Sequence, residues 1–283
     1  MLAFFLMFFT TFCFSSMAAL IKGLNEAIPP AEIVFLRSLF SLPFLYILNK
    51  YFHQKLFSRD RFNIMVRSLS GFIAMLFYFK ALPLIPLAMA SFLYNTQPIF
   101  VATMAPFFLN EKIKRSTIIS ITFGLFGIFL ILKPGFEFQI PSVYMLISAS
   151  TAAIAHIFIR RTGFEENPLT VVFDFTFILT IISGIVSLPF FVIPLKSNLI
   201  QLILISILAA LGQILMTMAY TLEEAQRIAP VSYFGVIFAT FYGYIFWKEI
   251  PDTISIFGGI LIIIAGVILV WKKFLKFLFR LFL

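Results

Sequence analysis

The sequence predicts an all-α polytopic membrane protein, with ten transmembrane helices arranged as two inverted five-helix repeats. The chain is 61% hydrophobic and only 12% charged, whereas a soluble domain carries about 25% charged residues. Its mean hydropathy of +1.06 indicates more apolar surface than a core of 283 residues can hide. In addition, two stretches half a chain apart, one around Glu111 and one around Glu249, share a pattern of two apolar runs joined by a short polar break. We infer that the surplus apolar surface faces lipid.

Ten apolar runs are long enough to cross a bilayer. A membrane-spanning helix needs about 20 mainly apolar residues. In lipid, backbone amides must be satisfied within their own element, so such runs form helices. Polar or proline-containing breaks separate them, as at Asn167-Pro168. The runs cover roughly residues 2–21, 31–49, 62–81, 86–108, 116–132, 141–159, 168–193, 199–219, 229–247 and 253–271.

The distribution of basic residues predicts that both termini are cytoplasmic. Cytoplasmic loops of membrane proteins carry an excess of Lys and Arg. With the N-terminus inside, the inner segments hold Lys50, Lys55, Arg59, Arg61, Lys112, Lys114, Arg115, Arg160, Arg161, Arg227, Lys272, Lys273, Lys276 and Arg280. The outer loops hold only Lys22, Lys133, Lys196 and Lys248, with Lys80 near the same face. We therefore expect a multi-pass protein of the inner (plasma) membrane.

The two halves of the chain match at an offset of 138 residues, at which Glu111 aligns with Glu249. An odd number of spans in each repeat makes the second copy enter the membrane from the opposite face. Repeats related in this way are typical of alternating-access carriers. We divide the chain into a first repeat, 1–138, and a second repeat, 139–283, which ends in a short basic tail. Both glutamates are expected to be interfacial hinge or capping residues.

One motif recurs in both halves: a proline near the start of a span, a glutamate at its end, and a following span with glycines. In the second copy it reads Ala229-Pro230, then Lys248-Glu249-Ile250-Pro251-Asp252, then Gly258-Gly259. This pattern resembles the EamA domain of the drug/metabolite transporter superfamily, over essentially the whole chain. The EIVFLR stretch at 32–37 looks most like the branch that contains S-adenosylmethionine uptake carriers. The resemblance implies a ten-helix carrier of a small metabolite.

Two ionisable side chains lie about two turns into predicted spans, Arg37 in the second and Asp174 in the seventh. A charged side chain at the bilayer centre costs about 2.5–3.5 kcal/mol on insertion scales, so it needs an interior cavity or a partner. We expect both to point into a central cavity from opposite halves, where they pair with each other or hold a zwitterionic ligand. Alternatively, Arg37 reaches the headgroups or pairs with Glu32.

The fourth span carries polar residues around a proline. Pro98 leaves the carbonyl of Tyr94 without its usual donor, and helices interrupted in this way often bind substrates in carriers. Tyr94 and Gln97 are three residues apart and share a face. Asn95 and Gln97 point about 200° apart on a regular helix, so we expect that they do not line the same wall. The alternative is a packing kink with interhelical hydrogen bonds.

The second half offers matching candidates. Ser232 and Tyr233 follow Pro230, and Tyr233 aligns with Asn95 at the repeat offset. His156 in the sixth span and Gln213 in the eighth are further candidates for substrate binding. A hydrogen bond between helices is the structural alternative for both.

Other polar and small residues are assigned to structure. Arg67 and Lys80 are expected to reach the two membrane interfaces. Gly235, Ala239 and Gly243 form a small-residue stripe at four-residue spacing, where another helix can approach closely.

The sequence also bears on the class of function. It has no GxxxxGK[ST] loop for ATP, and one cysteine and two histidines without ligand spacing predict neither a metal site nor a cofactor. We expect a secondary transporter and not an enzyme, with S-adenosylmethionine or an amino-acid-like solute as substrate. Its partners are the substrate and the lipid bilayer, not nucleic acid, and a homodimer is left open. The alternatives are a multidrug or metabolite efflux carrier and, in another class, a membrane-embedded enzyme.

Overall fold

The computed structural model describes residues 2–24, 27–109, 115–132, 140–162, 166–265 and 268. Over these residues the chain is helical and contains no strand. The helices are α1 (Leu2–Gly23), α2 (Pro30–Tyr51), α3 (Arg61–Ala81), α4 (Leu87–Tyr94), α5 (Gln97–Leu109), α6 (Arg115–Leu132), α7 (Ile140–Thr162), α8 (Pro168–Ser187), α9 (Lys196–Leu222), α10 (Ala225–Ile228) and α11 (Phe234–Trp247). Short 3-10 segments are η1 (Leu82–Leu84), η2 (Leu188–Phe190) and η3 (Ala229–Tyr233). A last helix covers Thr253–Ala265.

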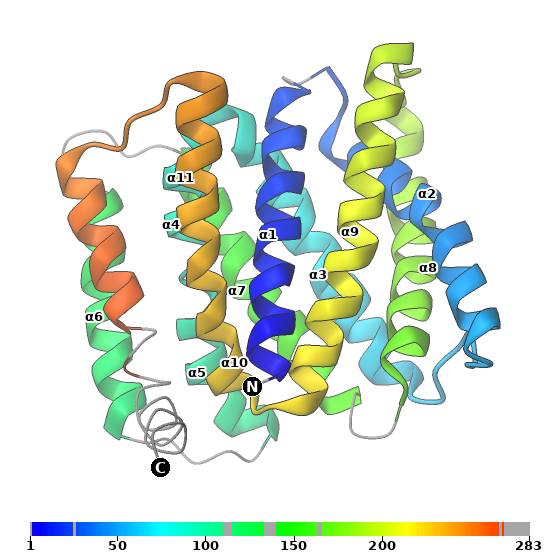
Figure 1. Ribbon diagram of the computed structural model, residues 1–283, viewed down its shortest axis with the longest axis horizontal. Coiled ribbons are helices and arrows are strands. Elements are labelled where there is room, and N and C mark those ends of the chain that lie inside the picture. Colours follow the sequence, from blue (N-terminus) through cyan, green and yellow to red (C-terminus); the bar gives the residue numbers. More distant parts are fainter. Residues whose placement is uncertain are drawn as a thin grey trace.

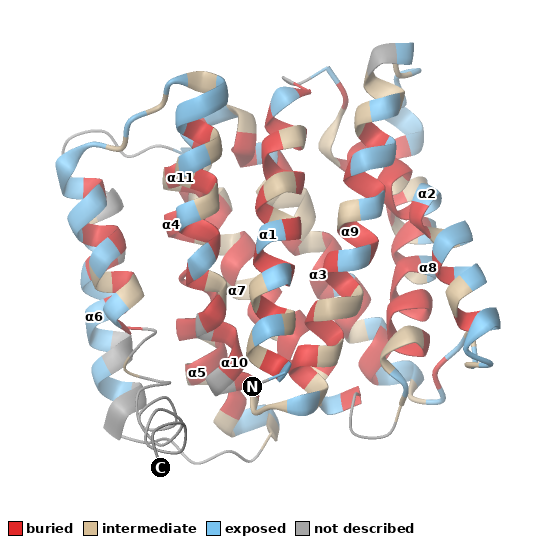
Figure 2. Ribbon diagram, viewed as in Figure 1, coloured by how far each residue is buried: buried red, intermediate tan, exposed pale blue. Residues whose placement is uncertain are grey.

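These helices make a multi-pass membrane protein. Within the described residues, six helices are long and apolar enough to cross a membrane: α1, α2, α3 extended to Leu84, α7, α8 extended to Phe190, and α9 from Asn198. Two shorter apolar helices cover Val231–Trp247 and Thr253–Ala265. Large apolar side chains such as Phe5, Ile47 and Ile185 are exposed on their outer faces. Figure 2 shows this contrast as blue outer faces around a red interior, which is the arrangement that lipid stabilises.

Helix packing follows a symmetric plan. The helix α1 packs against α9 and α11, while α7 packs against α3 and α5. Likewise, α2 packs against α9, while α8 packs against α3, and α2 and α8 pack against each other. Each of these contacts has a counterpart in the other half. The counterparts follow when α1, α2, α3 and α4–α5 are exchanged with α7, α8, α9 and α10–α11, and the contact between α2 and α8 is its own counterpart. In Figure 1, α2 and α8 lie at one side of the bundle, and α6 and the last helix at the other.

Two of the predicted spans are interrupted helices. The run 86–108 is divided into α4 and α5 by a turn at Asn95 and Thr96. Pro98 is the second residue of α5, a place in the first helical turn where its missing N–H is tolerated. The run 229–247 consists of η3 followed by α11, with Pro230 in the first turn of η3. Both interruptions therefore coincide with a proline.

An ion pair between the buried Lys22 and the half-buried Glu249, which follows α11, ties α1, α11 and α4 together at the end of the bundle where α1 ends. Lys22 donates from Nζ to Glu249 Oε1 at 2.5 Å and to the Ile85 carbonyl at 2.7 Å. The other oxygen of Glu249 accepts the Leu87 N–H at 2.7 Å, at the start of α4, where helical N–H groups lack partners. The left-handed φ of 55° at Lys248 turns the chain there. Glu249 is thus a capping residue as expected, but it caps another helix, α4.

The aligned Glu111 lies outside the described residues. The small-residue stripe of α11 packs as predicted: a Cβ added at Gly235 would meet Ser15 Oγ of α1 at 3.3 Å. One added at Gly243 would meet the Glu249 carboxylate at 3.0 Å and Leu87 at 3.6 Å. Close approach of α11 to α1 and α4 therefore depends on these small residues.

Candidate functional site

A cavity lies between the two halves of the bundle. It has about 1080 Å³ of empty space, part of which is open to the outside. Its lining residues on α1 run from Met7 to Ala18, so the cavity follows the middle of that helix. Seven of the nine predicted site residues line it: Arg37, Tyr94, Asn95, Gln97, His156, Gln213 and Ser232.

The two interrupted helices meet at the cavity. Ser232 of η3 donates from Oγ to Asn95 Oδ1 at 2.9 Å, and Asn95 Nδ2 in turn donates to the Ser91 carbonyl at 2.8 Å. Asn95 and Gln97 both line the cavity, so the expected separation of these two side chains is wrong. The regular 100° step per residue does not hold across the turn at 95–96, which changes the direction in which Gln97 points.

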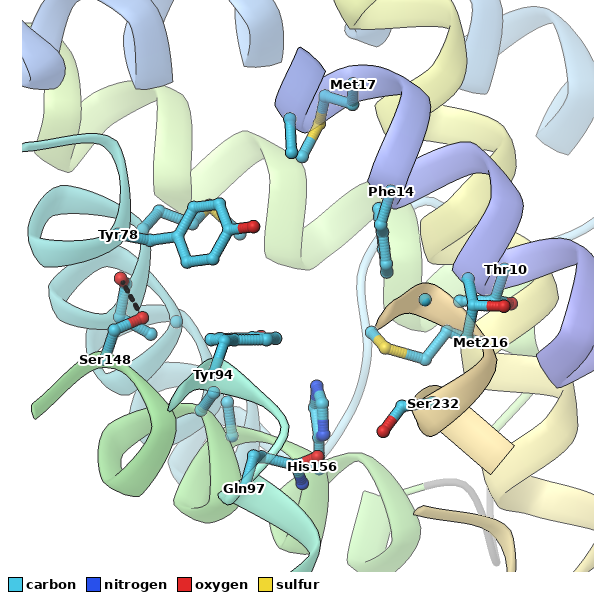
Figure 3. Close-up of a pocket in the computed structure, with 18 of the residues that line it drawn as sticks. Thr10, Phe14, Met17, Tyr78, Tyr94, Gln97, Ser148, His156, Met216 and Ser232 are labelled. Carbon is cyan, nitrogen blue, oxygen red and sulfur yellow. Dashed lines mark hydrogen bonds between the residues drawn. The ribbon is translucent and has the colours of Figure 1, made fainter. Parts of the chain in front are cut away.

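Three of the neutral polar residues lie together in one region. Figure 3 shows Gln97, His156 and Ser232 at one side of the cavity, with Met17 and Tyr78 at the opposite side. His156 Nδ1 lies 3.1 Å from the hydroxyl of the fully buried Tyr220. His156 therefore presents a ring already held by one hydrogen bond.

Arg37 reaches the cavity from α2. Its side chain is buried, with 3% exposed, so it does not extend to the headgroups. Among the described residues, the hydrogen-bond acceptors of its guanidinium are thioethers: Nη1 lies 3.5 Å from Met17 Sδ and Nη2 lies 3.0 Å from Met75 Sδ. The Nε group has no hydrogen-bond partner among the described residues. Its expected local partner, Glu32, instead accepts the Val192 N–H at 2.9 Å.

Arg67 also lines the cavity, which corrects the expectation that it reaches a membrane interface. It is 1% exposed and donates to Gln213 Oε1 and Thr217 Oγ1, both at 3.2 Å, and to the Val171 carbonyl at 3.3 Å. Its guanidinium lies 4.5 Å from the centroid of the Phe175 ring. A sequence signal was present, because Arg67, Gly71, Met75 and Tyr78 recur at helical spacing and all line the cavity.

Asp174 does not fulfil the expectation that it points into the cavity or pairs with Arg37. It is fully buried but faces the chain that enters α3. One oxygen accepts the Ser58 N–H at 2.9 Å, and the carboxylate pairs with Arg61 at 2.8 Å, with 59% of the Arg61 side chain exposed. The physical reason is competition: these donors lie close to Asp174, whereas Arg37 is held between α1 and α3.

Tyr233 is also absent from the cavity lining. It is buried, and its hydroxyl makes no hydrogen bond with the described residues. Its neighbour Ser232 occupies the cavity wall instead, since η3 is a 3-10 helix in which successive residues point in quite different directions.

The charge of the cavity wall is one-sided. Arg37 and Arg67 line it, and no Asp or Glu of the described residues does. Within that part of the chain, no group of three or more His, Cys, Asp or Glu side chains could hold a metal ion. The wall therefore combines two guanidinium groups with neutral polar, aromatic and thioether groups.

The sequence profile of the EamA-like transporter family matches residues 1–133 and again residues 139–271. The chain belongs to the EamA-like transporter family. It is therefore a membrane transporter, and the family assignment made from the recurring motif is confirmed.

Relatives of this EamA-like transporter include proteins named for transport in both directions. It is 34% identical to the pseudopaline exporter CntI of Pseudomonas aeruginosa, over 92% of each chain. It is 30% identical to an uncharacterized transporter of Helicobacter pylori, over 93% of each chain. It is 24% identical to an S-adenosylmethionine uptake transporter of Rickettsia bellii, over 89% of this chain and 87% of that one.

A solved crystal structure has the same fold. It aligns with 94% of this chain and 95% of its own, with a TM-score of 0.74 and 18% sequence identity. At this identity the likeness concerns the fold alone.

Proposed function

We propose that this transporter is a secondary carrier that moves a small metabolite across the inner membrane by alternating access. One observation carries the proposal: the cavity is built where two interrupted helices, one from each half, meet and share the hydrogen bond between Ser232 and Asn95. Binding at interrupted helices between two repeats is a recurrent design of secondary carriers.

The proposal includes ten membrane crossings in two inverted repeats, 1–138 and 139–283. Two observations support it. The family profile matches the chain twice, with the matches beginning 138 residues apart. The packing of α1 on α9 and α11 and of α2 on α9 corresponds to the packing of α7 on α3 and α5 and of α8 on α3. Five crossings per repeat make the second repeat inverted.

We also propose that both termini are cytoplasmic. The chain order puts the ends of α2 and α7 at the same end of the bundle as the N-terminus (Figure 1). Lys50, Arg61 and Arg160 lie near that end, in agreement with the excess of basic residues on the cytoplasmic side.

Export of a metabolite is the direction that we favour. The sequence identity to a protein named as an exporter is 34%, and the sequence identity to a protein named for S-adenosylmethionine uptake is 24%. The expected alternative, a metabolite efflux carrier, thus has more support than uptake of S-adenosylmethionine. The membrane-embedded enzyme has no supporting observation in the described cavity.

Counterflow in proteoliposomes tests transport directly. Vesicles are preloaded with a candidate solute, and accumulation of the labelled solute from outside is measured across a panel of amino acids, nucleosides and S-adenosylmethionine. Ala155 of α7 lines the cavity, and Ala155→Phe, which fills part of the cavity with a ring, is expected to abolish exchange. The matched control Ile181→Phe, at an exposed position of α8, is expected to keep it. Equal exchange by both variants would exclude the cavity as the transport route.

A further inference from the structure

The Arg37 guanidinium is a buried cation without a strong acceptor. Arginine stays protonated in proteins, and a thioether sulfur is only a weak acceptor. The hydrogen-bond contacts recorded for the Arg37 guanidinium are to Met17 and Met75 sulfurs, and its Nε has no hydrogen-bond partner in the described part of the chain. A charge this deeply buried requires a partner. An anion bound in the cavity would supply the oxygen acceptors that this guanidinium does not find in the described part of the chain.

The neighbouring acidic side chains do not supply it. Glu32, on the same helix, accepts the Val192 N–H, Asp174 is held by Arg61 and Ser58, and Glu249 is held by Lys22 and Leu87. None of these carboxylates lines the cavity. The cavity that Arg37 lines is thus the place where an anion can reach its guanidinium.

Arg67 differs, although it lines the same cavity. Gln213, Thr217 and Val171 accept its hydrogen bonds, and the Phe175 ring covers one face of its guanidinium. The protein itself therefore supplies Arg67 with oxygen acceptors, and Arg67 needs no ligand to satisfy its charge.

We propose that the transported substrate carries a carboxylate, and that Arg37 binds this carboxylate in the central cavity. This inference rests on the proposed transport function and specifies the class of its substrate. The planar guanidinium matches a carboxylate through two parallel hydrogen bonds.

The charge balance favours a single carboxylate over a phosphate or a cation. A phosphate monoester brings a charge of about −1.5 to −2, whereas of the two arginines in the described cavity lining, Arg37 is the one without an oxygen acceptor. S-adenosylmethionine carries a carboxylate that suits Arg37, but its ammonium and sulfonium groups find no carboxylate in the described lining. The rest of the substrate meets the apolar surfaces of Phe14 and Met216 and the neutral polar region at Gln97 (Figure 3).

Ligand-induced stabilisation of the purified protein tests this assignment without any transport step. A ligand that binds the native state raises the midpoint of thermal unfolding. The probes are N-acetyl-L-methionine and N-acetyl-L-phenylalanine, each compared with its primary carboxamide, and S-adenosylmethionine, all at millimolar concentration. We expect the two acids to raise the midpoint of the wild-type protein, and the amides and S-adenosylmethionine to have at most a small effect.

Variants then locate the binding group. Arg37→Met is expected to weaken binding of the acids by roughly 10- to 100-fold, since a hydrogen bond to a charged group is lost. Arg37→Lys keeps the charge but not the planar fork, so an intermediate response is expected. Arg59→Gln removes one positive charge from an exposed residue and should bind the acids as the wild type does.

Three results would overturn the inference: acids and amides acting alike on the wild type, no response to either acid, or an unchanged acid response in Arg37→Met. The first two need no variant, so a variant that does not fold leaves the test intact. Counterflow separates this inference from the proposed function. Exchange of neutral or cationic solutes without acid binding contradicts only the inference. Acid binding at Arg37 without any exchange contradicts the transport proposal and leaves Arg37 as a carboxylate-binding group.

Discussion

Arg37 and Arg67 line the same cavity but have very different surroundings. Both lie about two turns into a helix of the first half, both are buried, and both line the same cavity. Arg67 donates to three oxygen acceptors of the protein, whereas Arg37 meets two sulfur atoms. Burial alone therefore does not distinguish a structural cation from a cation that binds a ligand. The hydrogen-bond acceptors that the protein provides for each guanidinium make that distinction.

The largest effect is expected for Arg67→Met. Loss of Arg67 leaves Gln213 Oε1 and Thr217 Oγ1 without their donor, and unsatisfied buried polar groups cost about 1–3 kcal/mol each. We expect the free energy of unfolding to fall by roughly 2–4 kcal/mol. Arg37→Met, measured without ligand, should show no such loss. Denaturant titration in mixed micelles compares the two, and equal losses would remove the distinction between them.

A smaller effect is expected for Glu249→Gln, which tests a third buried cation. Lys22 resembles Arg67 in having oxygen acceptors, one from Glu249 and one from Ile85. The substitution removes the charge partner but leaves an oxygen for the Leu87 N–H, so we expect a loss of about 1–3 kcal/mol. The unfolding midpoint of this variant should lie between those of Arg67→Met and the wild type. A midpoint equal to that of the wild type would show that the Glu249 charge does not stabilise Lys22. Lys22 would then resemble Arg37, which folds without a charged partner from the described protein.

Ser232→Ala addresses the neutral polar region of the cavity, opposite the methionine contacts of Arg37. It removes the hydrogen bond to Asn95 Oδ1, and a single neutral hydrogen bond contributes about 0.5–1.5 kcal/mol. Because this bond joins the two interrupted helices, we expect counterflow to slow more than the small loss of stability explains. Thr122→Ala, at an exposed hydroxyl of α6, is the matched control. Unchanged exchange rates in Ser232→Ala would indicate that the bond serves packing only.

The smallest effect on transport is expected for Arg61→Gln. Its ion pair with Asp174 joins a side chain that is 59% exposed to a carboxylate that is fully buried. The carboxylate keeps the hydrogen bond from the Ser58 N–H, but it loses a charged donor, so we expect the free energy of unfolding to fall by about 1–3 kcal/mol. Counterflow should be unchanged, since neither residue lines the cavity. A loss of exchange with normal folding would return Asp174 to the candidate substrate site.

The candidate site was partly predictable from the sequence. Arg37, Tyr94 and Gln97 can be identified from the sequence because a polar residue at bilayer depth, or next to a proline, costs free energy unless it has a partner or faces a cavity. Arg67 was missed because its distance from the helix end was compatible with reaching an interface. The helical spacing of Arg67, Gly71, Met75 and Tyr78 could have revealed the shared face. Asp174 was misassigned because depth in a span says nothing about which donors lie beside it.

The sequence by itself determined that this chain is a helical membrane protein, because hydropathy and run length leave no other way to satisfy the backbone in lipid. It also determined the family, through a motif that recurs after 138 residues. Only the tertiary structure decided which polar side chains meet. The turn at 95–96 changes the phase of a helix, and the acceptors around Arg37, Arg67 and Asp174 come from segments far away in the chain. Such pairings depend on helix packing and rotation, which spacing within one helix does not encode.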